Sequence, residues 1–152
     1  MTDPAVLAVL AALSLPTGTE WVDQKEVTCL TRAVYQEAGG RHVQTKIATA
    51  YAILDRAALE GMDVCKLVAD RKAFPWRPRQ SKLRADTFSE RVAWEESAQA
   101  AVLSYVGEVA RPCEGNPTHF DRFPGRWDKW KEPSYSIITC VLDGVGFWRR
   151  KP

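Results

Sequence analysis

The sequence predicts a predominantly helical α+β protein, with four to six helices and a small β-hairpin or short sheet in its last third. Before residue 107, apolar residues recur mostly at three- and four-residue spacing, as the buried faces of helices require. From Arg111 onward, prolines and glycines interrupt the chain and β-branched residues gather in one short run, which favours turns and strands. We therefore expect helices first and a small sheet afterwards.

A length of 152 residues suits one domain spanning 1–152, and 45% hydrophobic residues with six tryptophans are enough to form a buried core. The net charge of +2 is too small to indicate a protein that binds nucleic acid. Mild basicity attracts an anionic surface only weakly, because salt screens the attraction. We expect a monomer without a nucleic-acid partner.

Residues 1–16 are expected to form a helix that docks on the rest of the domain. Asp3 is a typical N-cap residue, and Pro4 suits the first helical position. The apolar run from Ala5 to Leu15 is too short to cross a bilayer as a helix, so we expect no stable membrane insertion. The run also lacks the preceding Lys or Arg of a secretory signal. A degenerate export or anchor segment is the alternative interpretation.

The next helix carries a carboxylate in an unusual position. Val27, Leu30 and the Ala33-Val34 pair form an apolar stripe, and Glu37 lies four residues after Ala33 and three after Val34. Its side chain therefore points with the stripe or along its edge. Gly39-Gly40 follows, and we expect these glycines to end the helix in a left-handed turn.

Burial and the negative end of the helix would act on Glu37 in the same direction. Both disfavour the anion and raise the pKa of a carboxyl group, which suits it to donate a proton to a leaving oxygen. The alternative is an ordinary solvated glutamate at the rim of a helix, since perturbed acids are uncommon outside functional sites.

Three more helices are predicted before the character of the chain changes. A long helix begins at His42-Val43 and ends at Gly61, and a short helix follows the N-cap residue Asp63. A third long helix spans Phe88–Val106. Its apolar residues, Val92 among them, are spread broadly enough to predict a largely enclosed helix.

Residues 71–82 form the longest irregular stretch before residue 107, because two prolines forbid a regular helix there. Phe74 and Trp76 lie within it. The two aromatic rings either anchor the segment to the core or form a wall of a substrate cleft, in which aromatic faces contact sugars and arginines meet carboxylates.

The last third contains the strand signals. Thr118-His119-Phe120 is expected to be a short strand or an extended arm. Residues 135–141 are the best candidate strand, because β-branched residues are dense there. Asp143-Gly144 is a turn signal, after which Phe147-Trp148 returns to the body.

The four cysteines are Cys29, Cys65, Cys113 and Cys140. They form no CxxC pair and no cluster with histidine, so the sequence predicts no metal site. An even number permits two disulfides in three possible connectivities, while buried free thiols would pack as small hydrophobes. Both alternatives remain open at this point.

The run from Arg32 to Gly40, RAVYQEAGG, resembles the RAVY-x-EA-x-G motif of the SleB-type cell-wall hydrolases, a family of spore cortex-lytic enzymes and related phage and bacterial peptidoglycan hydrolases. Later segments resemble the family's further motifs in the same order: ILDR at 53–56, VCKLV at 64–68, FPW at 74–76, THF at 118–120 and GFW at 146–148. The resemblance covers a core of 25–148. Arg41, Pro75 and Val145 depart from the pattern, since the family has an acid, a serine and a histidine there.

The resemblance implies a lysozyme-like fold and lytic transglycosylation of peptidoglycan glycan strands, with Glu37 as the catalytic acid and without a metal or cofactor. The acid would protonate the glycosidic oxygen between N-acetylmuramic acid and N-acetylglucosamine. The C6 hydroxyl of the muramic acid would then close on the anomeric carbon. Because this nucleophile is tethered to the substrate, the reaction needs no second carboxylate of the kind that ordinary glycosidases use.

The same motifs suggest which residues would bind substrate: Tyr35, Phe74, Trp76, Thr118, His119 and Phe120. For His119, a packed or surface imidazole is the alternative. A hydrolytic muramidase or glucosaminidase, or a non-catalytic glycan-binding module on the same fold, are the alternative functions. We expect action on the bacterial cell wall, in the periplasm or envelope. The lack of a classical signal peptide suits a phage enzyme that a holin releases or a virion carries.

Overall fold

A computed structural model describes residues 3–13, 22–70, 72–74, 87–122 and 136–150. These residues contain five helices and one three-stranded antiparallel sheet near the C-terminus, which confirms the predicted α+β, predominantly helical class. The elements are α1 (Pro4–Ala12), α2 (Gln24–Ala38), α3 (Val43–Glu60), α4 (Val64–Ala69), α5 (Phe88–Val106), β1 (His119–Arg122), β2 (Ser136–Leu142) and β3 (Val145–Arg150).

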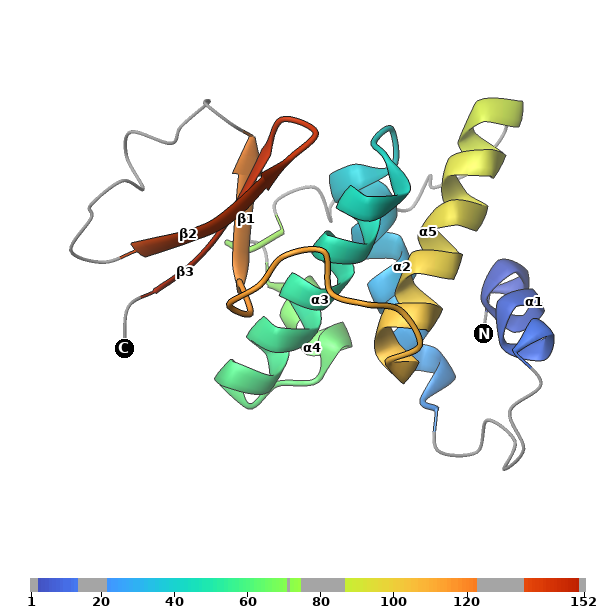
Figure 1. Cartoon of the computed structure of the whole chain (residues 1–152). Coiled ribbons are helices and arrows are strands. Elements are labelled where there is room, and N and C mark those ends of the chain that lie inside the picture. Colours follow the sequence, from blue (N-terminus) through green and yellow to red (C-terminus); the bar gives the residue numbers. More distant parts are fainter. Residues whose placement is uncertain (1–2, 14–21, 71, 75–86, 123–135, 151–152) are drawn as a thin grey trace.

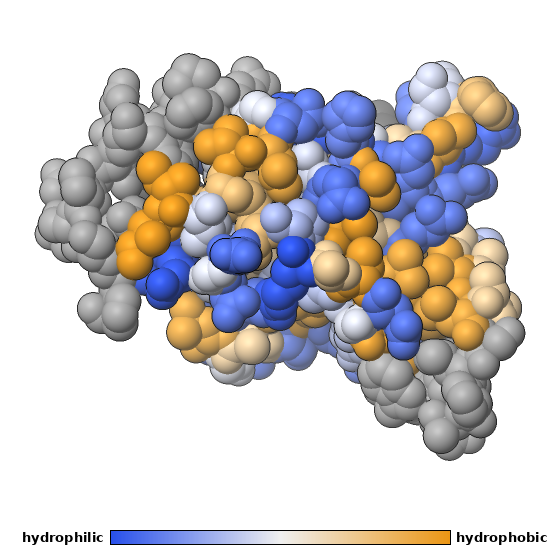
Figure 2. All heavy atoms as spheres, in the orientation of Figure 1, coloured by the Kyte–Doolittle hydropathy of each residue, from blue (hydrophilic) through white to orange (hydrophobic). Residues whose placement is uncertain are grey.

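The core lies where α2, α3 and α5 pack against one another. The sheet lies on one side of this group, beside α3, and α1 lies on the opposite side, against α5 (Figure 1). Val6 and Leu10 bury one face of α1 in the common core, as expected for a docking helix. Figure 2 shows apolar side chains gathered over α1 and the part of α5 beside it.

Local capping explains most helix boundaries. Asp3, Asp23, Asp63 and Thr87 each accept a hydrogen bond from a backbone N–H in the first turn of the helix that follows. At the other end, α3 and α5 stop at Gly61 and Gly107, which both have positive φ, and the end at Gly61 was predicted.

Gly39 ends α2, but not through the left-handed turn that the sequence suggested. Its φ of −57° and ψ of −34° are ordinary right-handed helical values. Glycine is required there for a different reason: a Cβ atom would lie 2.4 Å from the carbonyl oxygen of Tyr35. Nothing would lie within 4 Å of a Cβ atom on Gly40. The helix therefore ends in a turn so tight that a side chain does not fit.

The prediction of a largely enclosed α5 is wrong for its first half. Phe88 is 76% exposed and Val92 is 37% exposed. The buried residues of α5 lie between Ser97 and Ser104, in its second half. The wide spread of apolar residues around this helix therefore predicted more burial than the structure has.

The sheet has the strand order β1-β3-β2, and β3 pairs antiparallel with both neighbours. The predicted turn joins β2 to β3, with positive φ at Asp143 and Gly144. Phe147 of β3 lies in a second, smaller core cluster with Ala48 and Ala52 of α3. This contact attaches the sheet to the helical part of the protein.

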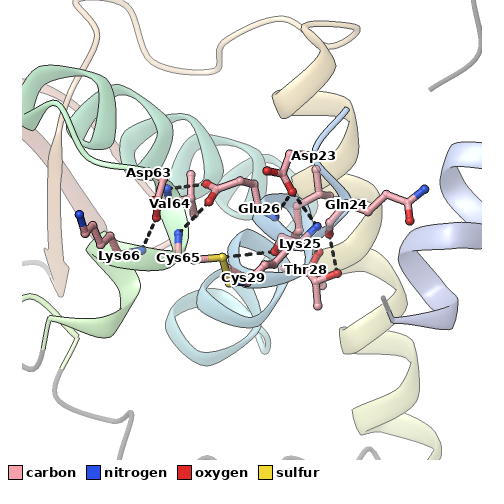
Figure 3. Close-up of a disulfide and its surroundings, with 12 residues drawn as sticks. Asp23, Gln24, Lys25, Glu26, Thr28, Cys29, Asp63, Val64, Cys65 and Lys66 are labelled. Carbon is pink, nitrogen blue, oxygen red and sulfur yellow. Dashed lines mark hydrogen bonds between the residues drawn. A yellow bond between two sulfur atoms is a disulfide. The ribbon is translucent and has the colours of Figure 1, made fainter. Parts of the chain in front are cut away.

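Two disulfides settle the connectivity that the sequence left open. Cys29 on α2 is bonded to Cys65 on α4, with their Cα atoms 5.3 Å apart (Figure 3). Cys113 is bonded to Cys140 on β2, which ties the segment before β1 to the sheet. No described helix is long and apolar enough to span a membrane. The described residues also contain no cluster of His, Cys, Asp or Glu that could hold a metal ion.

Candidate functional site

Glu37 is the penultimate residue of α2 and is half-buried. The residues one helical turn before it, Ala33 and Val34, are both 0% exposed, as is Leu30. Side chains three and four residues apart share a helix face, so Glu37 continues the buried stripe to the helix end. No basic residue lies in the last turn of α2. The carboxylate therefore lies where the negative end of the helix dipole and its own partial burial combine.

The turn between β2 and β3 is fastened beside this helix end. Arg41 donates a hydrogen bond from Nη1 to the carbonyl oxygen of Asp143. The backbone N–H of His42 donates to Oδ2 of Asp143 at 3.1 Å. The α2–α3 turn that follows Glu37 is thus held against the tip of the β2–β3 hairpin. Neither bond has a local sequence signal, because more than a hundred positions separate the partners.

His119 opens β1 and is held in a fixed, partly buried position. Its ring stacks on that of Trp148 with centroids 4.3 Å apart, and its Nδ1 lies 2.9 Å from the Thr118 hydroxyl. Burial, with smaller effects from the charges of Arg56 and Arg150, lowers the pKa of His119 to about 4. The imidazole is therefore neutral at neutral pH. It can accept or donate a hydrogen bond, but it carries no positive charge at neutral pH.

Phe120, next along β1, faces the protein interior. It packs against both core clusters, and its ring centroid lies 6.0 Å from that of Phe147. Successive residues of a strand point to opposite faces, so the rings of Phe120 and His119 leave β1 in different directions. Phe120 thus has a packing role, and its role in substrate binding stays a prediction.

Tyr35 is separated from Glu37, although both lie in the same motif. Residues two apart on a helix point about 200° apart. The ring of Tyr35 meets that of Trp94 edge-on, with centroids 5.1 Å apart, and burial raises the pKa of its phenol. Both rings line a cavity of about 660 Å³ between α1 and α5. Tyr35 therefore lies on a different side of α2 from Glu37, and its role in substrate binding stays a prediction.

Phe74 is 2% exposed and belongs to the main core. Its backbone N–H donates to the carbonyl of Asp70 at 2.8 Å, which closes the turn after α4. Of the two alternatives for this ring, the structure supports an anchor, because a buried ring offers no face to a sugar. Trp76 lies outside the described residues.

Five acidic residues are candidates for a second catalytic carboxylate, and the structure describes three of them. Asp55 accepts two hydrogen bonds from Arg111, and Asp63 caps α4. Asp121 lies half-buried on β1, in register with Gly146 of β3. Asp128 and Glu132 lie outside the described residues.

Comparison with family models, with curated proteins and with solved structures gives no significant match to this chain. Its functional assignment therefore depends on the residues of the site and on the order of the sequence motifs.

Proposed function

We propose that this protein cleaves the bond between N-acetylmuramic acid and N-acetylglucosamine in peptidoglycan, as a lytic transglycosylase with Glu37 as its acid and base. One observation carries the proposal. Glu37 is a half-buried carboxylate that continues a fully buried helix stripe into the last helical turn. The resemblance of residues 32–40 and of the later segments to the SleB-type cell-wall hydrolases, and with it a lysozyme-like fold, belongs to the same proposal.

The proposed reaction uses a single carboxyl group twice. Protonated Glu37 donates its proton to the glycosidic oxygen as the bond to the anomeric carbon of the muramic acid breaks. The C6 hydroxyl of the same sugar forms the new bond to that carbon, and its proton passes to the Glu37 carboxylate. The products are a 1,6-anhydro-muramic end and a free N-acetylglucosamine hydroxyl, so the acid is regenerated. Tethering the nucleophile replaces a positioned water molecule.

The surroundings of Glu37 support the first step. The carbonyl groups at the end of α2 place negative partial charge beside the carboxyl group, and partial burial removes some of its hydration. In the proposed reaction the carboxyl group acts as the general acid from this position. The bonds from Arg41 and His42 to Asp143 hold the adjoining turn in place, which fixes the direction of the helix end.

Two disulfides also favour a protein that works outside the cytoplasm, because such bonds persist in oxidising compartments. The bacterial envelope is such a compartment, and it contains the proposed substrate. The two disulfides therefore support the location that the proposed function requires.

Digestion of purified sacculi tests the proposal. We expect the Glu37→Gln variant to fold and to lose roughly 10²–10⁴-fold in cleavage rate, because the amide cannot donate the proton. Glu60→Gln is the matched control, since Glu60 is an exposed carboxylate that also ends a helix. A Glu37→Gln variant that clears sacculi at nearly the wild-type rate would sink the proposal.

Mass spectrometry of the released fragments separates the alternatives. Anhydro-muramic ends support transglycosylation, and reducing ends indicate a hydrolytic muramidase or glucosaminidase. Binding to sacculi without any fragment release indicates a non-catalytic glycan-binding module.

A further inference from the structure

A second cavity, of about 680 Å³, lies at the C-terminal end of α3. Its lining comes from α3, the turn before β1 and the end of β3: Asp55, Leu59, Gly115, Asn116, Thr118, Arg149 and Arg150. Asp55 lies twelve residues after Val43, and therefore roughly 18 Å along the helix axis from the turn that follows Glu37. This cavity is distinct from the surroundings of Glu37.

Two arginines give the cavity its charge. Arg149 and Arg150 end β3, and neither forms an ion pair within the described part of the chain. The Nε atom of Arg149 is buried without a hydrogen-bond partner among the described residues. It lies 3.8 Å from the position of a Cβ atom on Gly115, which places it beneath the turn before β1. A buried guanidinium nitrogen without an acceptor indicates a place for an anion.

The carboxylate in the lining is already neutralised. Asp55 accepts hydrogen bonds from both terminal nitrogens of Arg111, the second at 3.0 Å. Arg111 is itself held over the ring of Tyr51, 4.3 Å from the centroid. The charges of Arg149 and Arg150 therefore remain uncompensated within the lining. The positive charges that help to lower the pKa of His119 come from the same corner of the protein.

The cavity also offers neutral hydrogen-bonding groups. Thr118 is 8% exposed, and its backbone N–H donates to the carbonyl of Trp148, which fixes its position at the cavity wall. Gly115 and Asn116 both have positive φ, so the chain turns sharply there. A Cβ atom on Gly115 would also lie 3.2 Å from Cγ2 of Thr139. The turn is therefore rigidly placed beside the two arginines.

We propose that this cavity binds a carboxylate of the peptide stem that peptidoglycan carries, with Arg149 and Arg150 as its cationic ligands. The inference rests on the proposed function. A guanidinium matches the two oxygens of a carboxylate in geometry. An extended peptide of about five residues spans some 17 Å, which fits the separation between this cavity and the Glu37 turn.

Calorimetric binding to the intact protein carrying Glu37→Gln tests the assignment without turnover. The probes are soluble glycan fragments with intact peptide stems and the same fragments stripped of their stems. We expect stem-bearing fragments to bind at least about 10-fold more tightly, since charge-assisted hydrogen bonds are the strong ones. Adding Arg149→Gln and Arg150→Gln should abolish that preference. Adding Lys25→Gln and Arg91→Gln, two exposed cations elsewhere, removes the same charge and should preserve it.

Arg150→Gln alone provides a second variant at an exposed position, where folding is not at risk, and it should reduce the preference several-fold. If the arginine variants retain the full preference for stems, the cavity is not the stem site, although the proposed function stands. If neither probe binds any variant, the proposed function itself fails. A glycerol-phosphate oligomer that displaces the stem-bearing probe better than a free stem peptide would overturn the carboxylate assignment.

Discussion

The imidazole of His119 lies against the indole of Trp148, with ring centroids 4.3 Å apart and planes 21° from parallel. Burial of the histidine, to which this stacking contributes, and the charges of Arg56 and Arg150 lower its pKa from 6.5 to about 4. Between these pH values the unfolded chain binds a proton that the folded protein does not. The free energy of unfolding should therefore be highest above about pH 6.5 and fall as the pH approaches 4. After allowance for solvent screening, the loss is on the order of 1–3 kcal/mol.

Denaturant unfolding at several pH values between 7 and 4 measures this effect. His119→Gln removes the titrating group, so its stability deficit relative to wild type should shrink as the pH falls. His42→Gln, which changes the other and exposed histidine, is the control variant. A deficit for His119→Gln that is the same at pH 7 and pH 4 would contradict the prediction.

Glu26 should show the opposite pH dependence. Its carboxylate accepts hydrogen bonds from the N–H groups of Val64 at 2.5 Å and Cys65 at 3.5 Å, and so caps α4 beside the Cys29–Cys65 disulfide (Figure 3). Burial raises its pKa above 4.5 despite these bonds. The folded state thus holds a proton more tightly than the unfolded chain. This contribution to stability is fully present below pH 4.5 and is lost as the pH rises through the higher folded value.

Glu26→Gln removes the titration but keeps one acceptor for Val64. We expect a loss of about 1 kcal/mol at neutral pH from the weakened cap, and a larger deficit relative to wild type near pH 4. Glu108→Gln, at an exposed carboxylate after α5, is the control. Thermal or denaturant unfolding at both pH values gives the comparison, and a deficit that diminishes on acidification would show that the sign is wrong.

Local signals made most of the fold predictable from the sequence. Asp3, Asp23 and Asp63 cap helices through hydrogen bonds to residues two or three positions away, so a short window contains the whole interaction. Asp143-Gly144 likewise specifies its own turn. The disulfide pairing could not be predicted, because it depends on α4 lying across α2, which no local pattern encodes.

Some features of the candidate site could likewise be predicted from local sequence, and others could not. The position of Glu37 on the buried stripe follows from helical periodicity alone. The choice between an anchor and a cleft wall for Phe74 could be made only from its three-dimensional surroundings. Tyr35 could have been separated from Glu37 beforehand, since a spacing of two residues places side chains on opposite sides of a helix. The sequence could not show that the charges of Arg149 and Arg150 are uncompensated, because this depends on which cations pair with the nearby carboxylates. Arg111 pairs with Asp55.

An ion pair between α3 and α5, buried only on the side of Lys46, predicts an asymmetric response to mutation. Lys46 is 2% exposed, and its Nζ lies 2.6 Å from Oε2 of Glu96, which is 41% exposed. Glu96→Ala leaves a buried ammonium group without this partner and should cost about 2–4 kcal/mol. Lys46→Met keeps the packing without the charge, so its free energy of unfolding should be within about 1 kcal/mol of the wild-type value. Urea titrations decide the order, and a Lys46→Met variant less stable than Glu96→Ala would refute it.

The two glycines after Glu37 should respond differently to the same change. A Cβ atom on Gly39 would lie 2.4 Å from the Tyr35 carbonyl oxygen, to which the Gly39 N–H donates its hydrogen bond. Gly39→Ala must therefore open the turn, at a cost of about 1–3 kcal/mol. Gly40→Ala meets nothing within 4 Å and should be neutral or stabilise the fold by up to about 1 kcal/mol.

The activity of the two glycine variants tests whether this turn positions Glu37. Opening the turn displaces the last residues of α2, and a displacement of about 1 Å at a reacting group costs on the order of 10²-fold in rate. Gly39→Ala should therefore slow sacculus cleavage by about 10- to 100-fold, even at temperatures at which it is fully folded. Gly40→Ala should cleave at the wild-type rate. Equal activity of both variants, with Gly39→Ala folded by circular dichroism, would show that the tight turn serves stability and does not position the acid.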